Sequence, residues 1–392
     1  MNRDRWVNKK LGEVCQILNG FAFKSENYVD EGIRVMRITN VQKGEIVDDA
    51  PKYYPLTEMT KISQFLLSEN DLLMSLTGNV GRVGLLQKEM LPAALNQRVA
   101  CIRIKDNNLL LKYLFYKLNS NEFEHECIFN ATGIAQKNMS TEWLKKVSIP
   151  LPPKDIQQRI VEELDAISDS ISMFQQQMND LDSLAQSIFY DMFGDPIENP
   201  RHWDVKKVGD LASEIKYGTS SPACENGQYK YLRMCNITYN GYLDLSDMKK
   251  INISEAEIEK YIVRKGDILF NRTNSVDLIG KTCMFDEDEP MVIAGYIIRV
   301  RLKKNILPVY FARAFNLPSI KSVLRKMAKG AVNQANINSK ELASILLPLP
   351  PLELQNSFAS KMIEIEATKY SLSAQITAMK SMLSARMQYW LD

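Results

Sequence analysis

The sequence is poor in the residues that most often build metal sites and catalytic centres. It has only two histidines, His125 and His202, in 392 residues. Its six cysteines are scattered and form no C-x-x-C pair, which argues against a structural zinc site and a disulfide framework and favours a reducing cytoplasm. We therefore expect no metal in this chain, and any histidine-based catalytic triad would have to use one of these two residues.

Long apolar runs are lacking too. No stretch of about 18 apolar residues crosses the sequence, and no basic segment followed by an apolar one opens it. We expect a soluble, cytoplasmic protein without membrane contact. Hydrophobic residues nevertheless make up 45% of the chain, which is enough for buried cores, and the length suggests two or more domains.

Charge of one sign is also scarce, because the formal net charge is only +2. The charge is uneven along the chain. Residues 1–150 carry 20 Lys and Arg against 17 Asp and Glu, residues 151–196 carry 2 against 9, residues 197–350 carry 23 against 17, and residues 351–392 carry 4 against 4. DNA phosphate would favour the two mildly basic segments and avoid the acidic one.

What the sequence does contain is an internal repeat. Arg5–Val14, RWVNKKLGEV, returns 197 residues later as His202–Leu211, HWDVKKVGDL. The same order continues through Met36–Val41 with Leu232–Ile237, Glu69–Ser75 with Lys265–Asn271, Gly84 with Gly280, Thr132–Ser140 with Lys329–Asn338, and Val147–Gln157 with Ile345–Gln355. We predict two related domains, residues 1–150 and 197–350, followed by two long helical segments, residues 151–196 and 351–392.

Each copy of the repeat ends in a heptad pattern. Apolar residues recur after the proline pairs at alternating steps of four and three, which is typical of a coiled-coil seam. The predicted seam is formed by Ile160, Leu164, Ile167, Ile171, Phe174, Met178, Leu181 and Ile188 in the first helix and by Phe358, Met362, Ile365, Leu372, Ile376, Met379 and Leu383 in the second. The simplest arrangement is an antiparallel pair with pseudo-twofold symmetry. Alternatively, each helix packs on a different protein.

Two cations, Lys369 and Arg386, interrupt the second seam. A polar residue at such a position can fix the register of two helices. Alternatively, the seam faces a partner protein at these points, or the aliphatic stems are buried while the charges reach solvent.

The segments between the helices indicate domains of the α+β class. Short runs rich in β-branched residues predict strands at Ile33–Ile38, Val99–Ile104, Asp267–Phe270 and Tyr296–Leu302. Amphipathic helices are predicted at Leu109–Leu118 and Pro308–Phe315. We therefore expect two tandem α/β domains, separated by the two long helices.

Polar loops recur at matching places in the two domains, but their letters differ. Asn and Gln can pair with adenine and Arg with guanine in the major groove, and glycine lets a backbone approach phosphate. The candidate DNA-binding residues are Lys24, Ser25, Thr77, Asn79, Arg82, Asn96, Gln97, Arg98, Gln136, Lys137 and Asn138 in the first domain, and Arg272, Asn274, Ser275, Lys281, Asn333, Gln334 and Asn336 in the second. Taken singly, each of these residues could equally lie in an ordinary surface turn.

These features together resemble the specificity subunit of type I restriction–modification systems. The resemblance rests on the Trp-x-x-Lys-x-Leu/Val-Gly-acid opening of each half, the loop near Gly20, and the Pro-x-Pro-Pro-x-x-x-Gln junction into each long helix. It implies two target-recognition domains that read a bipartite, asymmetric site on double-stranded DNA, with the helices as a spacer. It also implies two methyltransferase (modification) subunits and restriction subunits as partners, which use S-adenosylmethionine, ATP and magnesium, so that this chain needs no cofactor.

Two other functions remain open. One is an enzyme, a nuclease or methyltransferase, with unrecognised motifs. The sequence has no Asn-Pro-Pro-Tyr/Phe methyltransferase motif, and Gly78–Gly84 lacks the ending of a phosphate-binding loop. The other is a coiled-coil adaptor that does not read DNA. We expect a non-catalytic protein that recognises DNA.

Overall fold

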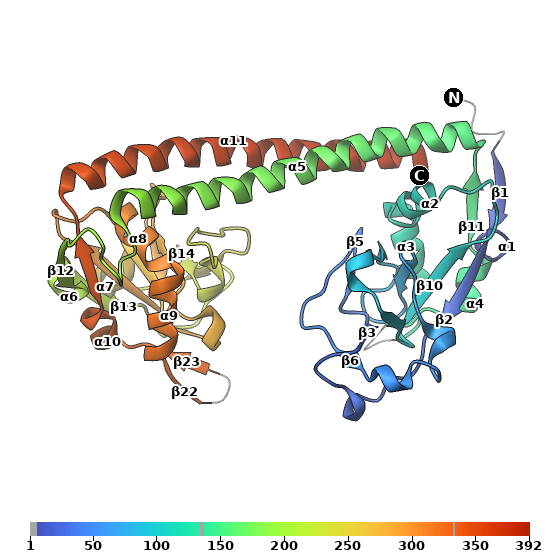
Figure 1. Ribbon diagram of the computed structural model, residues 1–392. Coiled ribbons are helices and arrows are strands. Elements are labelled where there is room, and N and C mark those ends of the chain that lie inside the picture. The colour runs from blue at the N-terminus through green and yellow to red at the C-terminus, as the bar shows by residue number, and fades with distance from the viewer. Residues whose placement is uncertain (1–5, 134–136, 332–333) are drawn as a thin grey trace. The chain divides into compact units, whose positions relative to one another are not determined.

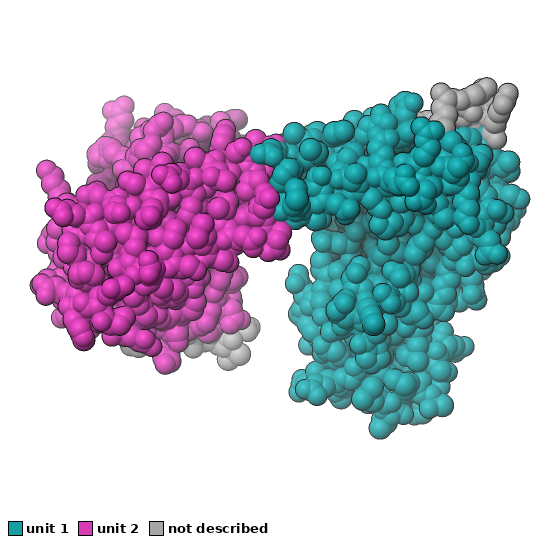
Figure 2. Space-filling model, turned by 45° about the horizontal axis from the view of Figure 1, so that its top comes forward, with its two compact units in different colours: residues 1–174, 375–392 teal, residues 175–374 magenta. Residues whose placement is uncertain are grey.

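The computed structural model describes residues 6–133, 137–331 and 334–392 (Figure 1). The chain forms two compact units (Figure 2): unit 1 consists of Met1–Phe174 and Gln375–Asp392, and unit 2 of Gln175–Ala374. The long helices α5 (Lys154–Phe193) and α11 (Leu352–Leu391) each contribute one part to each unit. None of the described helices combines the length and apolar character that a membrane span requires.

Unit 1 is built on an antiparallel sheet of four strands, in the order β2 (Cys15–Asn19), β10 (Val99–Ile104), β7 (Leu72–Ser75), β8 (Val83–Leu85). Smaller sheets join β1 (Val7–Lys10) to β11 (Ser148–Leu151), β3 (Ile33–Met36) to β6 (Tyr53–Tyr54) and β9 (Ala93–Leu95), and β4 (Val41–Gln42) to β5 (Glu45–Ile46). The helices are α1 (Leu11–Val14), α2 (Leu111–Leu118), α3 (Asn121–Asn130) and α4 (Thr141–Lys146).

Unit 2 repeats the central sheet as β13 (Ala212–Tyr217), β21 (Ile297–Leu302), β17 (Ile268–Asn271), β19 (Thr282–Met284). The other sheets contain β12 (Asp204–Lys207) and β24 (Leu346–Leu349); β15 (Lys249–Ile251), β14 (Tyr229–Leu232), β20 (Met291–Ile293) and β16 (Ile262–Val263); and β18 (Thr273–Asn274), β23 (Gln334–Asn336) and β22 (Lys329–Ala331). The helices are α6 (Val208–Leu211), α7 (Glu255–Tyr261), α8 (Pro308–Asn316), α9 (Pro318–Met327) and α10 (Ser339–Ser344). The predicted class, two tandem mixed domains with two long helices, is confirmed.

The assignment of Gly84 to Gly280 is wrong. Gly81 is the counterpart of Gly280, because both have positive φ, 80° and 72°, and both close the loop that follows the third strand of the central sheet. Gly84 lies in β8 opposite Leu73, where unit 2 has Cys283. The error arose because this loop is three residues longer in unit 2, which runs from Asn271 to Gly280 rather than from Ser75 to Gly81.

A buried glutamine joins each long helix to its domain. The Gln157 Oε1 accepts from the N–H of Leu110 at 2.8 Å, and its Nε2 donates to the carbonyl oxygen of Pro152 at 2.8 Å. Gln355 makes the same bonds, to Leu307 and Pro350, at 2.8 Å each. Both glutamines are 0% exposed. A buried amide with its hydrogen bonds made fixes orientation, so the repeated junction motif sets the direction in which each helix leaves its domain.

The long helices pack against each other within each unit. In unit 2, Asp182 contacts Lys369, while Phe189 and Phe193 contact Phe358. Residues further along α5 therefore meet residues nearer the start of α11, and the pair is antiparallel. The residues of the predicted seam are all buried or half-buried.

Phe189 and Phe193 are absent from the predicted seam, yet they are among the most buried residues of α5, at 1% and 3% exposure. The aromatic ring of each packs against the ring of Tyr310 of α8, with ring centroids 5.4 and 4.9 Å apart, respectively. Ile188, which the seam predicts, is half-buried. The end of α5 thus turns its buried face toward the domain core as well as toward α11.

The two cations that interrupt the second seam, Lys369 and Arg386, each form an ion pair with a carboxylate of α5. The Lys369 ammonium lies 2.6 Å from the Asp182 carboxylate and donates to the Tyr242 hydroxyl at 2.7 Å. In unit 1 the Arg386 guanidinium pairs with Glu163, whose pKa it lowers by hydrogen bonding. Each carboxylate accepts from one cation of the facing helix, which agrees with a role in register.

One ion pair recurs in the two central sheets. Arg103 Nε lies 2.8 Å from the Asp71 carboxylate in unit 1, and Arg301 Nε lies 3.0 Å from Asp267 in unit 2. Both carboxylates are nearly buried, at 6% and 5% exposure. Each pair links the residue just before the third strand of its sheet to the second strand.

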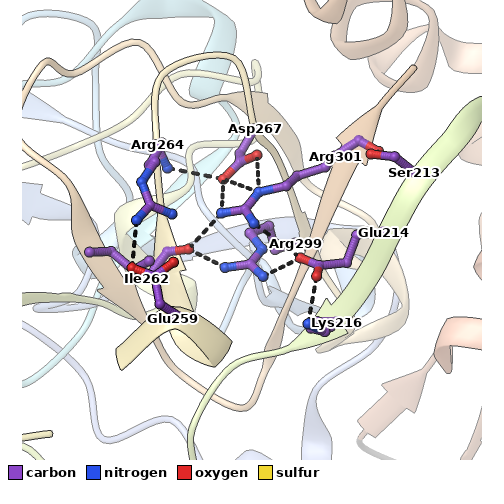
Figure 3. A network of polar contacts seen from close by, with 9 residues as sticks. All are labelled: Ser213, Glu214, Lys216, Glu259, Ile262, Arg264, Asp267, Arg299 and Arg301. Carbon is purple, nitrogen blue, oxygen red and sulfur yellow. Dashed lines mark hydrogen bonds and ion pairs between the residues drawn. The ribbon is translucent and has the colours of Figure 1, made fainter. Parts of the chain in front are cut away.

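Unit 2 adds a second arginine to this site (Figure 3). Arg299 is fully buried where unit 1 has Cys101, since both lie opposite the corresponding leucine of the neighbouring strand. Its guanidinium contacts Glu214 and the carbonyl oxygen of Ile262. Burial alone raises the pKa of Glu214, but hydrogen bonds from Lys216 and Arg299 lower it overall. The carboxylate therefore stays charged and compensates the buried guanidinium.

Candidate nucleic-acid interface

Four loops that are far apart in the sequence meet at one end of the central sheet of unit 1. The Leu76 N–H donates to the carbonyl oxygen of Arg98 at 2.9 Å, and the Leu76 carbonyl accepts from Met139 at 2.8 Å. The Gln97 N–H donates to Phe21 at 2.9 Å. Backbone bonds thus join the predicted loops around residues 21, 76, 97 and 138.

Unit 2 makes the same backbone bonds with different residues. The Arg272 N–H donates to the carbonyl oxygen of Tyr296 at 3.0 Å, and the Arg272 carbonyl accepts from Ile337 at 2.9 Å. The Gly295 N–H donates to Thr219 at 2.7 Å. We call each set of four joined loops a loop frame: residues 19–25, 75–82, 96–98, and 132–133 with 137–139 in unit 1, and residues 217–221, 271–281, 294–297 and 334–338 in unit 2.

A glycine lets two of these loops touch in each frame. A Cβ at Gly20 would lie 2.2 Å from the carbonyl oxygen of Asn96, and a Cβ at Gly218 would lie 2.2 Å from that of Ile293. No side chain can occupy that space without moving backbone. Gly20 and Gly218 are therefore required by close approach, which explains the glycine of the loop motif near Gly20 and its counterpart in unit 2.

The candidate residues of unit 1 fall into two groups. The exposed ones are Lys24, Ser25, Asn79, Gln97, Arg98, Lys137 and Asn138. Thr77 is buried at 8% exposure, and the half-buried Asn96 accepts from the N–H of Arg98 at 3.1 Å. Arg82 is half-buried and donates to Gln42. Thr77, Asn96 and Arg82 therefore hold the frame, whereas the exposed group can reach a ligand.

The second unit divides in the same way. Ser275 is exposed, and Asn274 and Arg272 are half-buried. The Arg272 guanidinium lies over the Tyr217 ring, 4.9 Å from its centroid. Asn336 accepts from the Thr273 hydroxyl at 3.1 Å, inside the frame.

Lys281 is turned inward. Its ammonium donates to the carbonyl oxygen of Ile237 at 2.8 Å, and burial lowers its pKa. Its counterpart in unit 1 is Arg82, since each precedes the last strand of its central sheet and its carbonyl closes the loop. Gln136 and Asn333 lie outside the described residues, and for Gln334 the structure describes the backbone, in β23.

Two tyrosines of the second frame were not among the predicted residues. Tyr296 occupies the position of Arg98 and is 53% exposed. Tyr217 stacks on Arg272, and its hydroxyl accepts from the N–H of Ser339 at 2.7 Å. The repeat itself carried the signal, because Gln97-Arg98 and Gly295-Tyr296 stand 198 residues apart.

The chemistry of the two frames is that of a binding surface. Exposed amides, hydroxyls and guanidinium groups can donate to and accept from base edges and phosphates. Burial raises the pKa of Cys15 and Cys127 to about 12, so these thiols stay protonated. Within the described ranges, no group of three or more His, Cys, Asp or Glu side chains is arranged to hold a metal ion.

Two tandem mixed domains, each with a polar loop frame on a central sheet, define a modular binding protein. The sequence pattern of the family described as "Type I restriction modification DNA specificity domain" matches residues 3–182 and again residues 200–378. The chain belongs to this family, the specificity subunits of type I restriction–modification systems, which recognise DNA targets.

Curated relatives agree over nearly the whole chain. The chain is 22% identical to the EcoKI specificity subunit of Escherichia coli K12, with 95% of this chain and 84% of that protein covered. It is 24% identical to the EcoBI specificity subunit of Escherichia coli, with 95% and 82% covered.

Solved structures share the fold. The S subunit of a type I restriction–modification system from M. genitalium superposes with a TM-score of 0.51 at 14% identity, covering 99% of this chain and 96% of that one. A chain from a structural study of complex assembly and conformational transition of the type I system gives a TM-score of 0.53 at 16% identity, covering 98% and 97%.

Proposed function

We propose that this chain is the non-catalytic subunit that reads a bipartite, asymmetric DNA target, one half through each loop frame. The observation that carries the proposal is the repeated backbone frame with different side chains on it. The frame carries Arg98 in one unit and Tyr296 in the other at the same hydrogen-bonded position. A shared frame with divergent side chains is expected when one scaffold reads two different base sequences.

Partner subunits complete the activity in this proposal. Two modification subunits bind the chain and transfer a methyl group from S-adenosylmethionine to adenine, and restriction subunits use ATP and magnesium to cleave DNA. The relatives support this role, since each is named as the specificity subunit of a type I restriction enzyme. The chain itself contributes recognition and no chemical step.

The antiparallel helices act as the spacer between the two half-sites. The glutamine junctions fix each helix to its domain, and the ion pairs of Lys369 and Arg386 fix the register of the helices. Half-sites read from one face of the duplex lie about one helical turn, roughly 34 Å, apart. Inserting the same number of heptads in both helices would then lengthen the spacer between the half-sites without changing the bases read.

Methylome mapping tests the proposal. The chain is co-expressed with its modification subunit, and methylated adenines are mapped across the genome. The expected result is one bipartite motif with a methylated adenine in each half. Replacing residues 1–150 by the domain of another family member should change one half of the motif, and a change in both halves would contradict modular reading.

Two results would overturn the proposal. A stable complex that methylates a continuous, non-bipartite site would contradict the split target. Methyl transfer by the purified chain alone would favour the enzyme hypothesis, and a chain that forms no complex and retains no DNA would favour the adaptor.

A further inference from the structure

A buried lysine in unit 2 stands out because its neighbours are also cations. Lys321 of α9 is 3% exposed, and its ammonium donates to the carbonyl oxygen of Gly280 at 2.7 Å. Gly280 belongs to the second loop frame. Burial lowers the pKa of Lys321 to about 7, and the charges of Arg325 and Lys281 lower it as well. A buried ammonium beside two further cations is electrostatically costly unless an anion compensates it.

The partners of these cations are not carboxylates. Among the described residues, Lys321 bonds to Gly280, Lys281 bonds to the carbonyl oxygen of Ile237, and Arg325 donates to the Tyr239 hydroxyl at 3.0 Å. The Tyr239 ring also lies 5.6 Å from the Lys321 ammonium. The positive charge of this cluster is therefore uncompensated within the described part of the chain.

The cluster borders a cavity of about 300 Å³ in unit 2. Lys321, Arg325 and Tyr239 contribute to its wall, as does Arg313, which is paired with Glu366. Asp182 is the carboxylate among its lining residues. Asp182 is already paired with Lys369 at 2.6 Å. The cavity thus has the size and the charge to receive a phosphate group.

The matching position in unit 1 has the opposite charge. Gly81 faces Cys127 of α3 as Gly280 faces Leu324 of α9, so Glu124 is the counterpart of Lys321, and Ile128 that of Arg325. Glu124 is paired with Lys43 at 2.5 Å. The cationic cluster is therefore particular to unit 2 and does not belong to the shared frame.

We propose that Lys321, Arg325 and Tyr239 form a phosphate-binding site that holds the DNA backbone beside the second half-site. The inference rests on the proposed function and adds a contact outside the base-reading loops. Lys321 bonds directly to the loop that carries Arg272 and Ser275, so a phosphate here would set the position of that loop on the duplex. Phosphate contacts fix the register of a protein on the duplex without reading its sequence. Each contact between a cationic side chain and a phosphate changes the slope of log K against log salt by a known amount.

The test uses the full chain in complex with its modification subunit. Binding is measured by fluorescence anisotropy over a range of KCl concentrations, with one duplex that carries the methylated motif and one scrambled duplex of equal length. Arg325→Gln should weaken binding to both duplexes several-fold and by the same factor. The slope of log K against log salt should fall by about 1.

Two further variants make the result interpretable. Lys321→Met keeps the aliphatic stem and should also lower the slope, by less than Arg325→Gln, because Lys321 with a pKa of about 7 is charged only in part near neutral pH. The matched control is Arg264→Gln, which removes an equal charge from unit 2 at a residue already paired with Glu259 at 2.7 Å. The control should leave the slope unchanged.

Three results would overturn the inference while the proposed function stands. The first is unchanged slopes in both Arg325→Gln and Lys321→Met although the wild-type complex binds its motif. The second is weaker binding to the motif duplex with unchanged binding to the scrambled duplex, which would make the cluster a base-reading site. The third is loss of the modification subunit from the complex, which would assign the cavity to an acidic protein surface. A wild-type complex that binds neither duplex would overturn the proposed function itself.

Discussion

The two domains agree in their backbone bonds and differ in the charge of the helix behind their loops. Helix α3 carries Glu122, Glu124 and Glu126, whereas the matching α9 carries Lys321, Arg325 and Lys326. Backbone bonds depend on strand geometry and on a few glycines, so they persist when side chains change. Helix surfaces and loop side chains are free of that constraint. The comparison teaches that binding properties can diverge between the copies while the frame stays fixed.

The largest expected effect concerns the shared frame. Gly218→Val would place a Cβ 2.2 Å from the carbonyl oxygen of Ile293, so the two loops must separate. We expect unit 2 to lose roughly 3 kcal/mol of stability, the upper range for overpacking. Urea unfolding with hydrogen exchange on each unit measures it.

Gly44→Ala is the matched control for this change. Gly44 has positive φ, 84°, which Gly218 does not have, and a Cβ at Gly44 meets no atom within 4 Å, so the cost of this variant is backbone strain alone, about 1 kcal/mol. Equal losses for the two variants would show that close approach is not what requires Gly218.

A medium loss of stability is expected from the interhelical ion pairs, which differ in burial between the two ends of the helix pair. Lys369 is 6% exposed and pairs with Asp182, whereas the side chains of Arg386 and Glu163 are about one third exposed. Lys369→Met leaves Asp182 without its cation, although Asp182 and Glu366 both still contact the Tyr242 hydroxyl, and we expect a loss of about 2 kcal/mol. Arg386→Met should cost less, since solvent screens its pair.

Salt distinguishes the two ends. The effect of Arg386→Met should shrink as KCl is raised, because exposed pairs are screened, and that of Lys369→Met should persist. The double variant Lys369→Met with Asp182→Asn should recover part of the lost stability. Equal salt sensitivity of the two single variants would contradict the burial difference.

A pH dependence of the stability of unit 2 is also expected, from Lys321 of α9. The folded-state pKa of Lys321 is about 7, well below its ordinary value of 10.5. Between these values the unfolded chain binds more protons, so the free energy of unfolding rises with pH in this window. The charged groups facing Lys321 are Lys281 and Arg325, with Tyr239 beside them.

Lys321→Met should remove this rise. The measurement is urea unfolding at pH 6.5 and pH 9 for both proteins, where groups other than Lys321 titrate alike and cancel in the difference. The variant should gain most relative to wild type at pH 6.5. An unchanged pH profile would mean that Lys321 is not held near its neutral form.

Much of the fold could be predicted from the sequence because the chain contains two copies of the same domain pattern. The strand at Val99–Ile104 and the helix at Pro308–Phe315 were predicted within a residue or two, since periodicity reports burial directly. The heptad pattern located the helix pair, but it missed Phe189 and Phe193, which turn toward a third element. It also left three explanations for Lys369, and the structure pairs this lysine with Asp182 of the facing helix.

The candidate interface was predicted less completely. Loop chemistry selected Thr77, Asn96 and Lys281 along with Asn79, Gln97 and Arg98, yet the first three are turned into the frame. Composition cannot distinguish a polar side chain that holds a loop from one that faces solvent. Whether each exposed residue contacts DNA stays a prediction.

The sequence by itself determined the duplication, the strand and helix periods, the junction glutamines and the glycines, because these depend on local spacing along the chain. The tertiary structure decided which distant loops meet, which polar side chains are buried, and that Lys321, Arg325 and Tyr239 gather at one cavity. Those outcomes depend on contacts between residues far apart in the chain, such as Arg325 and Tyr239, which are 86 positions apart. Such contacts produce no periodic pattern in the sequence.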